Sequence, residues 1–198
     1  LKENEVPIID EKVEEIFDDS IDDDREKERA KSRWAQLEAV VGAEPRIKQI
    51  TEDLINHFET RSKTQPGKAM IVCMSREICV KFYDALRKIK PELHDDELSK
   101  CQMKVVMTAS ASDPKEFQPH HTNRLQKKNL EKRFKDPSDP LKIVIVRDMW
   151  LTGFDAPCLT TMYVDKPMQG ANLAQAIARV NRVFGDKPGG LVVDYIGI

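Results

Sequence analysis

Short apolar runs alternate with amphipathic segments along most of this chain. Five runs have the length and composition of strands buried on both faces of a sheet, namely 69–74, 104–108, 142–146, 160–164 and 190–193. Between them, apolar residues recur at the three- and four-residue spacing of helices in 76–90, 123–134 and 172–183. Strands that alternate with helices are typical of parallel βαβ units with right-handed crossovers. The pattern therefore predicts an α/β fold with a mainly parallel central sheet.

The N-terminal third has a different pattern, in which charged residues dominate. Apolar residues fall at helical spacing only in its later part, at Ile47, Ile50, Leu54 and Phe58, after a proline that suits a first helical turn. The charged residues around them leave too few apolar positions for a large core. We therefore predict a helical linker or connector over residues 1–64 and a sheet domain over residues 65–198.

Composition narrows the class of protein. The 198 residues suffice for one well-buried domain with additional elements. No apolar run approaches the roughly 20 residues of a membrane-spanning helix, and the first residues are too acidic for a signal peptide. The four cysteines form no CxxC pair, which favours reduced thiols and a cytoplasmic protein without membrane partners. The net charge of −2 combines an acidic segment, 1–33, with a mildly basic remainder that permits phosphate contacts.

Polar residues follow directly after three of the predicted strands. Ser75 and Arg76 come after the first strand, Ser110 after the second, and residues 152–155 shortly after the third. The carboxyl ends of parallel strands meet at one edge of a sheet, where the ligands of such folds bind. We therefore expect these residues to converge.

The strongest chemical signal is a pair of arginines. Arg179 and Arg182 lie three residues apart in the last predicted helix, and hence on one of its faces. Arginine is always charged, and its forked donors suit phosphate. An inserted arginine also stabilises the charge on a transferring phosphoryl group. Such a pair alone is more often solvated, or bound to an acid such as Asp155, but the turn Thr152-Gly153-Phe154-Asp155 favours phosphate recognition.

The chain lacks the sequence motifs that cradle a phosphate. Neither GxxxxGK[ST] nor GxGxxG occurs, and Gly189-Gly190 suits a turn into the last strand. Arginines without a phosphate loop indicate half of a site, completed by a nucleotide held on another domain. His120 and His121 have no further ligands at metal-binding spacing, so no metal site is predicted. A GxSxG nucleophile motif is also absent.

Several segments of the chain resemble a known family. The R (restriction and translocation) subunits of type I restriction enzymes carry strings similar to PLKIVIVRDMWLTGFDAP, TMYVDKPMQG, QAIARVNRVF and DKPGGLVVDYIGI. The resemblance extends over about residues 37–198 and is tightest from residue 141 onward. It implies the C-terminal RecA-like lobe of a superfamily 2 helicase-type motor, which is a three-layer α/β domain.

The resemblance assigns one group of residues to DNA. The segment IVCMSRE resembles helicase motif IV, so Ser75 and Arg76 would lie near the DNA phosphates. The segment VVMTASASD resembles the next DNA-facing motif, with Thr108 and Ser110 as its backbone contacts. In RDMWLTGFD, which resembles motif V, Thr152 would touch DNA.

A second group of residues would face the nucleotide. The same motif V segment would place Gly153 and Asp155 at the interface between the lobes. The segment QAIARVNR resembles motif VI, whose Gln175, Arg179 and Arg182 would face the γ-phosphate. Within this group, Arg182 is the expected arginine finger.

The resemblance also implies cofactors and partners. ATP and Mg²⁺ would be bound mainly by a first RecA-like lobe with a Walker A motif, and duplex DNA would be the track. The family's full-length subunit is an ATP-dependent endonuclease that also carries a nuclease domain and assembles with methylation and specificity subunits. Neither the nuclease domain nor the Walker A motif is in this sequence. We therefore expect a segment of a longer protein that is inactive alone.

Two other interpretations stay open at this point. The chain could be the second lobe of another superfamily 2 DNA helicase, such as a repair or remodelling motor. It could instead be a non-catalytic α/β binding module that uses the acidic helical N-terminal region for docking.

Overall fold

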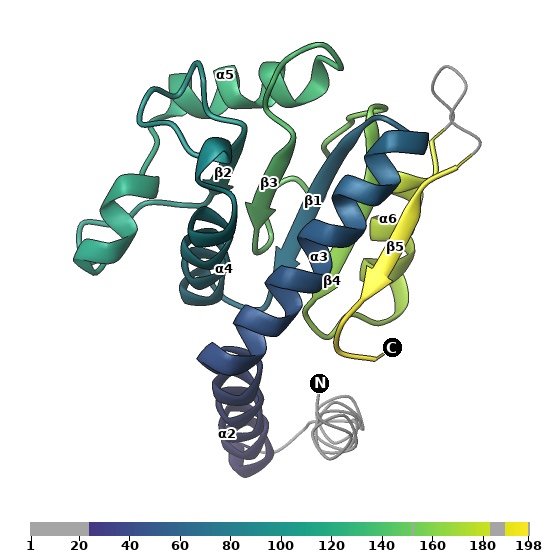
Figure 1. The fold of residues 1–198 in the computed structure, drawn as a ribbon. Helices are drawn as coiled ribbons and strands as arrows, with labels where there is room; N and C mark the ends of the chain where they lie inside the picture. Colours follow the sequence, from purple (N-terminus) through teal and green to yellow (C-terminus); the bar gives the residue numbers. More distant parts are fainter. Residues whose placement is uncertain (1–23, 152, 183–188, 198) are drawn as a thin grey trace.

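The apolar runs of the sequence form the strands of one sheet in the computed structural model, which describes residues 24–151, 153–182 and 189–197 (Figure 1). All five strands are parallel, in the order β2-β3-β1-β4-β5. The predicted α/β class is confirmed, and each strand lies within two residues of its predicted bounds. The strands are β1 (Lys68–Cys73), β2 (Met103–Val106), β3 (Ile143–Val146), β4 (Leu159–Asp165) and β5 (Leu191–Asp194).

The helices also match the periodicity of the sequence. The connections of the sheet contain α4 (Arg76–Ile89), α5 (Arg124–Lys135) and α6 (Gly170–Val180), with 3-10 turns η1 (Pro91–Leu93) and η2 (Lys115–His120). Ahead of the sheet lie α2 (Asp24–Val41) and α3 (Glu44–Thr64). A capping box between Asn123 and Gln126 starts α5, because each side chain bonds the other residue's backbone N–H.

One predicted helix ends earlier than the sequence indicated. We expected a helix over 172–183, but α6 ends at Val180, so Arg182 lies outside it. The chain that leads into β5 packs against this end of α6. A Cβ atom on Gly190 would lie 2.0 Å from the Val180 carbonyl oxygen, so only glycine allows this approach.

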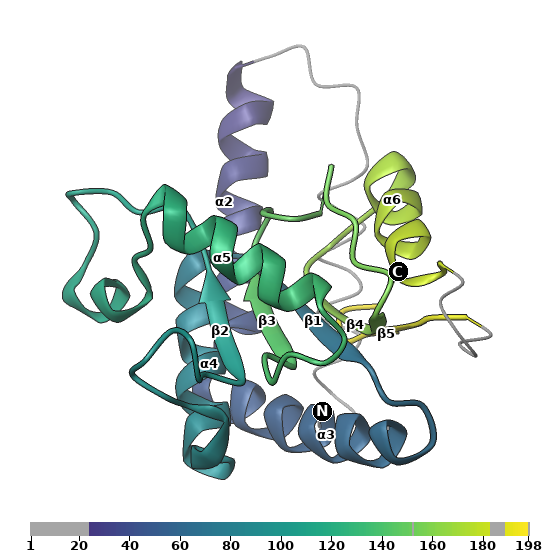
Figure 2. The same ribbon diagram turned by 90° about the horizontal axis from the view of Figure 1, so that it is seen from above.

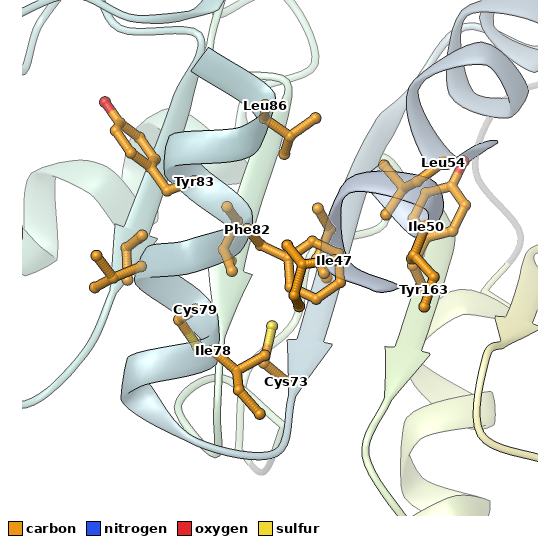
Figure 3. Packing of buried hydrophobic residues seen from close by; sticks show 14 of the residues in the cluster. Ile47, Ile50, Leu54, Cys73, Ile78, Cys79, Phe82, Tyr83, Leu86 and Tyr163 are labelled. Atoms are coloured by element: carbon orange, nitrogen blue, oxygen red, sulfur yellow. The ribbon is translucent and has the colours of Figure 1, made fainter. Parts of the chain in front are cut away.

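The sheet has helices on both faces, which gives three layers (Figure 2). Successive strand residues point to opposite faces, so Ala69 and Ile71 of β1 face one core while Met70 and Val72 face the other. The first core contains α3 and α4, and Figure 3 shows Ile47 of α3 beside Phe82 of α4. The second core contains α5 and α6. No helix among the described residues is long and apolar enough to cross a membrane.

Helix α3 is less solvated than its sequence indicated. Seven of its residues are buried, and its apolar ones share the core of α4 and the sheet. Burial of each aliphatic side chain contributes roughly 1.5–3 kcal/mol. Polar contacts add to this, since Tyr195 donates to Asp53 at 2.6 Å and His57 Nδ1 lies 2.8 Å from the Tyr163 hydroxyl. The predicted boundary at residue 64 stays a prediction, although the helix before it packs on the sheet.

Candidate functional site

The carboxyl edge of the sheet brings the predicted polar segments to one side of the molecule. Because all strands run in parallel, the segments after β1, β2 and β3 leave from the same edge. They carry Ser75 and Arg76, Thr108 and Ser110, and the described residues around position 154. Thr152, which we expected to touch DNA, lies outside the described residues.

Arg76 is held in place by the segment that follows β2. Its guanidinium donates to both carboxylate oxygens of Asp113 at 2.8 Å and to the Thr108 carbonyl at 2.9 Å. Its guanidinium carbon also lies 5.2 Å from the centre of the Phe117 ring, within the range of a cation–π contact. The guanidinium therefore joins the start of α4 to the segment after β2.

Asp113 is the centre of this network. Its side chain is only 2 % exposed, and it also accepts from the Ser110 backbone N–H at 2.8 Å and lies 3.0 Å from His121 Nε2. The hydrogen bond from Arg76 is the main cause that lowers the pKa of the Asp113 carboxyl below its usual range. The carboxylate thus stays ionised and fixes the turn that presents Ser110.

The four described residues of the DNA side differ in which of their polar groups remain accessible to a ligand. The Ser75 hydroxyl caps α4 by accepting from the Ile78 N–H at 3.3 Å, and Arg76 is engaged as described. Thr108 and Ser110 are exposed at the edge. The edge therefore presents the exposed side chains of Thr108 and Ser110 to a ligand, while Arg76 and Asp113 hold the backbone beneath them.

The segment after β3 is built on stacked aromatic rings. Trp150 and Phe154 stack with centroids 4.6 Å apart and planes 3° apart, and both stack on Phe134 of α5 at 5.9 and 6.1 Å. Such pairs contribute roughly 0.5–1.5 kcal/mol each beyond burial. Trp150 has a φ of 66°, which is unusual for a bulky residue and costs roughly 1–2 kcal/mol. The stack is thus strong enough to hold a strained backbone.

The two arginines have different surroundings. Arg179, on α6, is partly buried and donates to the backbone carbonyls of Leu151 and Phe154, the first through Nε at 3.2 Å. Arg182 donates to Asp155 at 2.7 Å, and both side chains are about half exposed. The alternative that an arginine pairs with Asp155 is therefore correct for Arg182 in this state of the molecule.

The remaining nucleotide-side residues lie at the surface. Gln175 is exposed on α6, and Gly153 is exposed with a φ of 66° and open space where a Cβ atom would stand. That φ favours glycine. A ligand could therefore approach the backbone closely at Gly153.

The two adjacent histidines face different partners. His121 contacts Asp113, whereas His120 is buried with its ring 4.6 Å from that of Tyr83. Burial lowers the pKa of His120 to about 4, with nearby Lys104 adding to the effect. Within the described ranges, no three His, Cys, Asp or Glu side chains are grouped as a metal site requires.

Sequence reasoning missed the residues that hold the site together. Asp113, Phe117, Phe134 and Trp150 belonged to no predicted site. An aspartate three residues after Ser110 is a weak turn signal, and nothing in the pattern indicated that Phe134 and Trp150 meet.

Comparison with known proteins identifies the family. A family model described as "Type I restriction enzyme subunit R domain 3" matches residues 114–197. The type I restriction enzyme HindI endonuclease subunit of Haemophilus influenzae is 53 % identical over 81 % of this chain. The chain belongs to the R-subunit family of type I restriction enzymes. The MjaIXP endonuclease subunit of Methanocaldococcus jannaschii is 47 % identical over 96 % of the chain.

This family's subunits are much longer than the chain. The matches span 16 % of the Haemophilus relative and 18 % of the Methanocaldococcus one. The activity and partners of a whole subunit therefore do not transfer to this chain directly.

Solved structures support the RecA-like fold. An HsdR fragment of a type I restriction enzyme from Vibrio vulnificus YJ016 matches 76 % of this chain and 28 % of its own, with a TM-score of 0.56 and 18 % identity. The Sulfolobus solfataricus SWI2/SNF2 ATPase core, solved with double-stranded DNA, matches all of this chain and 39 % of its own, with a TM-score of 0.54 and 16 % identity. The expected RecA-like α/β class is thus confirmed.

Proposed function

We propose that this chain is the second helicase-type lobe of an R subunit and serves ATP-driven translocation on duplex DNA. In this proposal Arg182 is the arginine finger. The observation that carries it is the half-exposed guanidinium of Arg182 on a chain that has no phosphate loop of its own. A cation so placed can be offered to a phosphate held by another lobe.

Nucleotide-side roles go to the exposed residues near this arginine. Gly153 leaves open space for a close approach, and Asp155 and Gln175 are exposed polar groups on neighbouring segments. Asp155 holds the guanidinium until a phosphate replaces it. This exchange costs little, because an exposed ion pair contributes only about 0–1 kcal/mol.

DNA-side roles go to the carboxyl edge. Thr108 and Ser110 are exposed there, and Ser75 and Arg76 lie beside them, with Thr152 as the motif V contact proposed from its sequence. The exposed hydroxyls suit contacts with the phosphate backbone of DNA, and such contacts carry no sequence information. A translocating motor needs contacts of this kind.

The cofactors and partners follow from this role. ATP would lie between this lobe and a first RecA-like lobe of the same cytoplasmic subunit. Mg²⁺ would be held mainly by that first lobe, since the described residues here offer no cluster of ligands for it. The nuclease domain of the subunit and the methylation and specificity subunits of the complex would be further partners. By this proposal, the chain alone is inactive.

The test is DNA-stimulated ATP hydrolysis by the full-length subunit that carries Arg182→Lys. Lysine keeps the charge but loses the forked donors. Turnover should fall by about 10³-fold, the scale of an arginine finger, while ATP still binds. Arg87→Lys, on the exposed side of α4, is the matched control and should keep normal turnover. Normal turnover by Arg182→Lys would instead favour a non-catalytic binding module.

A further inference from the structure

We infer that Trp150 and Arg179 are positioning residues that clamp the segment after β3 between α5 and α6. This inference rests on the proposed function, because the clamped segment leads into Asp155 and hence to Arg182. It assigns Arg179 to the protein backbone, whereas the family resemblance would place it at the γ-phosphate.

The first observation is the backbone of Trp150. A φ of 66° is a left-handed conformation, which large L-residues rarely adopt, and among the described residues no other non-glycine has a positive φ. Strained conformations of this kind persist only where the surroundings enforce them, and they cluster at functional sites. Glycine would relieve this strain, which indicates that the indole ring of Trp150 makes contacts that glycine cannot make.

The second observation is what the indole contacts. It lies parallel to the Phe154 ring, at 3° and 4.6 Å, and both rings stack on Phe134 of α5. Lys135, the next residue of α5, places its ammonium 4.9 Å from the centre of the Phe154 ring. The segment is therefore fixed to α5 at both of its ends, through the ring of Trp150 and the ring of Phe154.

The third observation is that α6 holds the same segment from the other end of the connection. Arg179 donates to the carbonyls of Leu151 and Phe154, so one side chain spans the tip of the segment. The Arg179 guanidinium could move toward a phosphate only by breaking both of these bonds and leaving the two carbonyls without their donor. Arg179 therefore fixes the backbone, and Arg182 is the arginine left for the nucleotide.

Together these contacts give the segment a rigid base and an open tip. Phe154 is 4 % exposed, whereas its neighbours Gly153 and Asp155 are exposed. Asp155 binds Arg182 at 2.7 Å, so the position of the aromatic base sets the position of that pair. A displacement of about 1 Å in such a group can reduce turnover by about 100-fold.

The experiment compares Trp150→Leu and Trp150→Phe in the full-length subunit. The leucine variant loses the stack, and its kcat for DNA-stimulated ATP hydrolysis should fall at least about tenfold. The KM for ATP and the Kd for DNA should stay within about twofold, because no ligand contact is removed. The phenylalanine variant keeps an aromatic ring and should retain most of the turnover. A normal kcat in the leucine variant, or equal losses in both variants, would overturn the inference.

Two controls separate positioning from loss of fold. Trp34→Leu alters the other tryptophan, which packs against the core on the opposite face of the sheet, and should leave kcat normal. If Trp150→Leu does not fold, Arg179→Gln tests the same clamp from α6 and should lower kcat with an unchanged KM for ATP. A raised KM for ATP in Arg179→Gln would mean that Arg179 contacts the nucleotide, against the inference.

Arg182→Ala distinguishes the two levels of the proposal. If it abolishes turnover while Trp150→Leu and Arg179→Gln are normal, the proposed function stands and the clamp is wrong. If Arg182→Ala is itself normal, the proposed function fails whatever the clamp variants do. If Trp150→Leu and Arg179→Gln both lower kcat, the double variant should lose less than the product of the two single fold-losses in kcat. The reason is that both residues act on one segment.

Discussion

Replacing Arg46 with methionine should destabilise the chain by about 3–5 kcal/mol, the range for breaking a buried ion pair. Arg46 lies in the first turn of α3 and donates to both oxygens of Asp165, at the end of β4, at 2.6 and 3.2 Å. It also donates to the carbonyls of Val41 and Tyr195 at 3.0 and 3.1 Å. The two charged side chains are only 3 % and 1 % exposed. One guanidinium thus ties α2, α3 and the end of the sheet together.

The size of the loss comes from what methionine leaves behind. Asp165 would become a buried carboxylate without a cation, and the two carbonyls would lose their donors. Burial already raises the pKa of Asp165 above its usual range, against the opposing effect of Arg46. Without Arg46 this pKa should rise further. A carboxyl whose pKa is higher in the folded than in the unfolded chain lowers the stability of the fold as pH rises. The stability lost in Arg46→Met should therefore be larger at neutral pH than in acid.

Urea denaturation of the chain at pH 7, followed by far-UV circular dichroism, measures this loss by linear extrapolation. Arg46→Met/Asp165→Leu should recover most of the stability, because a buried pair can often be replaced by apolar residues. Arg182→Met is the matched control, since its half-exposed ion pair contributes only about 0–1 kcal/mol. A loss below about 1 kcal/mol for Arg46→Met, or a double variant less stable than the single one, would refute the reasoning.

Two further predictions concern the loop after β2. The buried His120, with a pKa of about 4 in the folded state and an ordinary value near 6.5 in the unfolded chain, should lower stability as pH falls from 6.5 to 4. The loss should reach at most about 3 kcal/mol, and His120→Leu should flatten the pH profile of urea denaturation; an unchanged profile would contradict the buried neutral state. Arg76→Gln should weaken DNA binding by the full-length subunit without changing its salt dependence, because the guanidinium is bound to Asp113. Asp113→Asn should do the same, whereas a slope of log affinity against log salt reduced by about 1 would mean that Arg76 binds a phosphate directly.

The sequence predicted the sheet well because burial on both faces leaves a simple signature. Runs such as Ile143–Val146 are apolar at every position, as is typical of a parallel strand that is covered on both faces. The convergence of Ser75 and Ser110 followed from that one inference, since parallel strands end at one edge. Topology therefore placed the segments that follow β1 and β2 at one edge, whereas the arginines of the nucleotide side came from the arginine pair and the family resemblance.

Contacts between residues far apart in the chain could not be predicted from the sequence pattern. Nothing local indicates that Arg46 meets Asp165, 119 positions later, or that Phe134 stacks with Trp150. The charged pattern of α3 also concealed its packing, because periodicity counts apolar positions and not the surface that they meet. At the end of α6, Gly190 approaches Val180 closely, which is again a contact between separate segments.

The early end of α6 explains how two similar arginines come to differ. Had the helix continued through residue 182, Arg179 and Arg182 would lie on one face and would meet the same surroundings. Because it ends at Val180, Arg179 stays against the Leu151 and Phe154 carbonyls while Arg182 reaches the surface beside Asp155. A phosphate can displace a half-exposed carboxylate at little cost, whereas releasing Arg179 would leave two backbone carbonyls without their donor. Under the proposed function, the geometry of this helix end would decide which of the two arginines meets a phosphate.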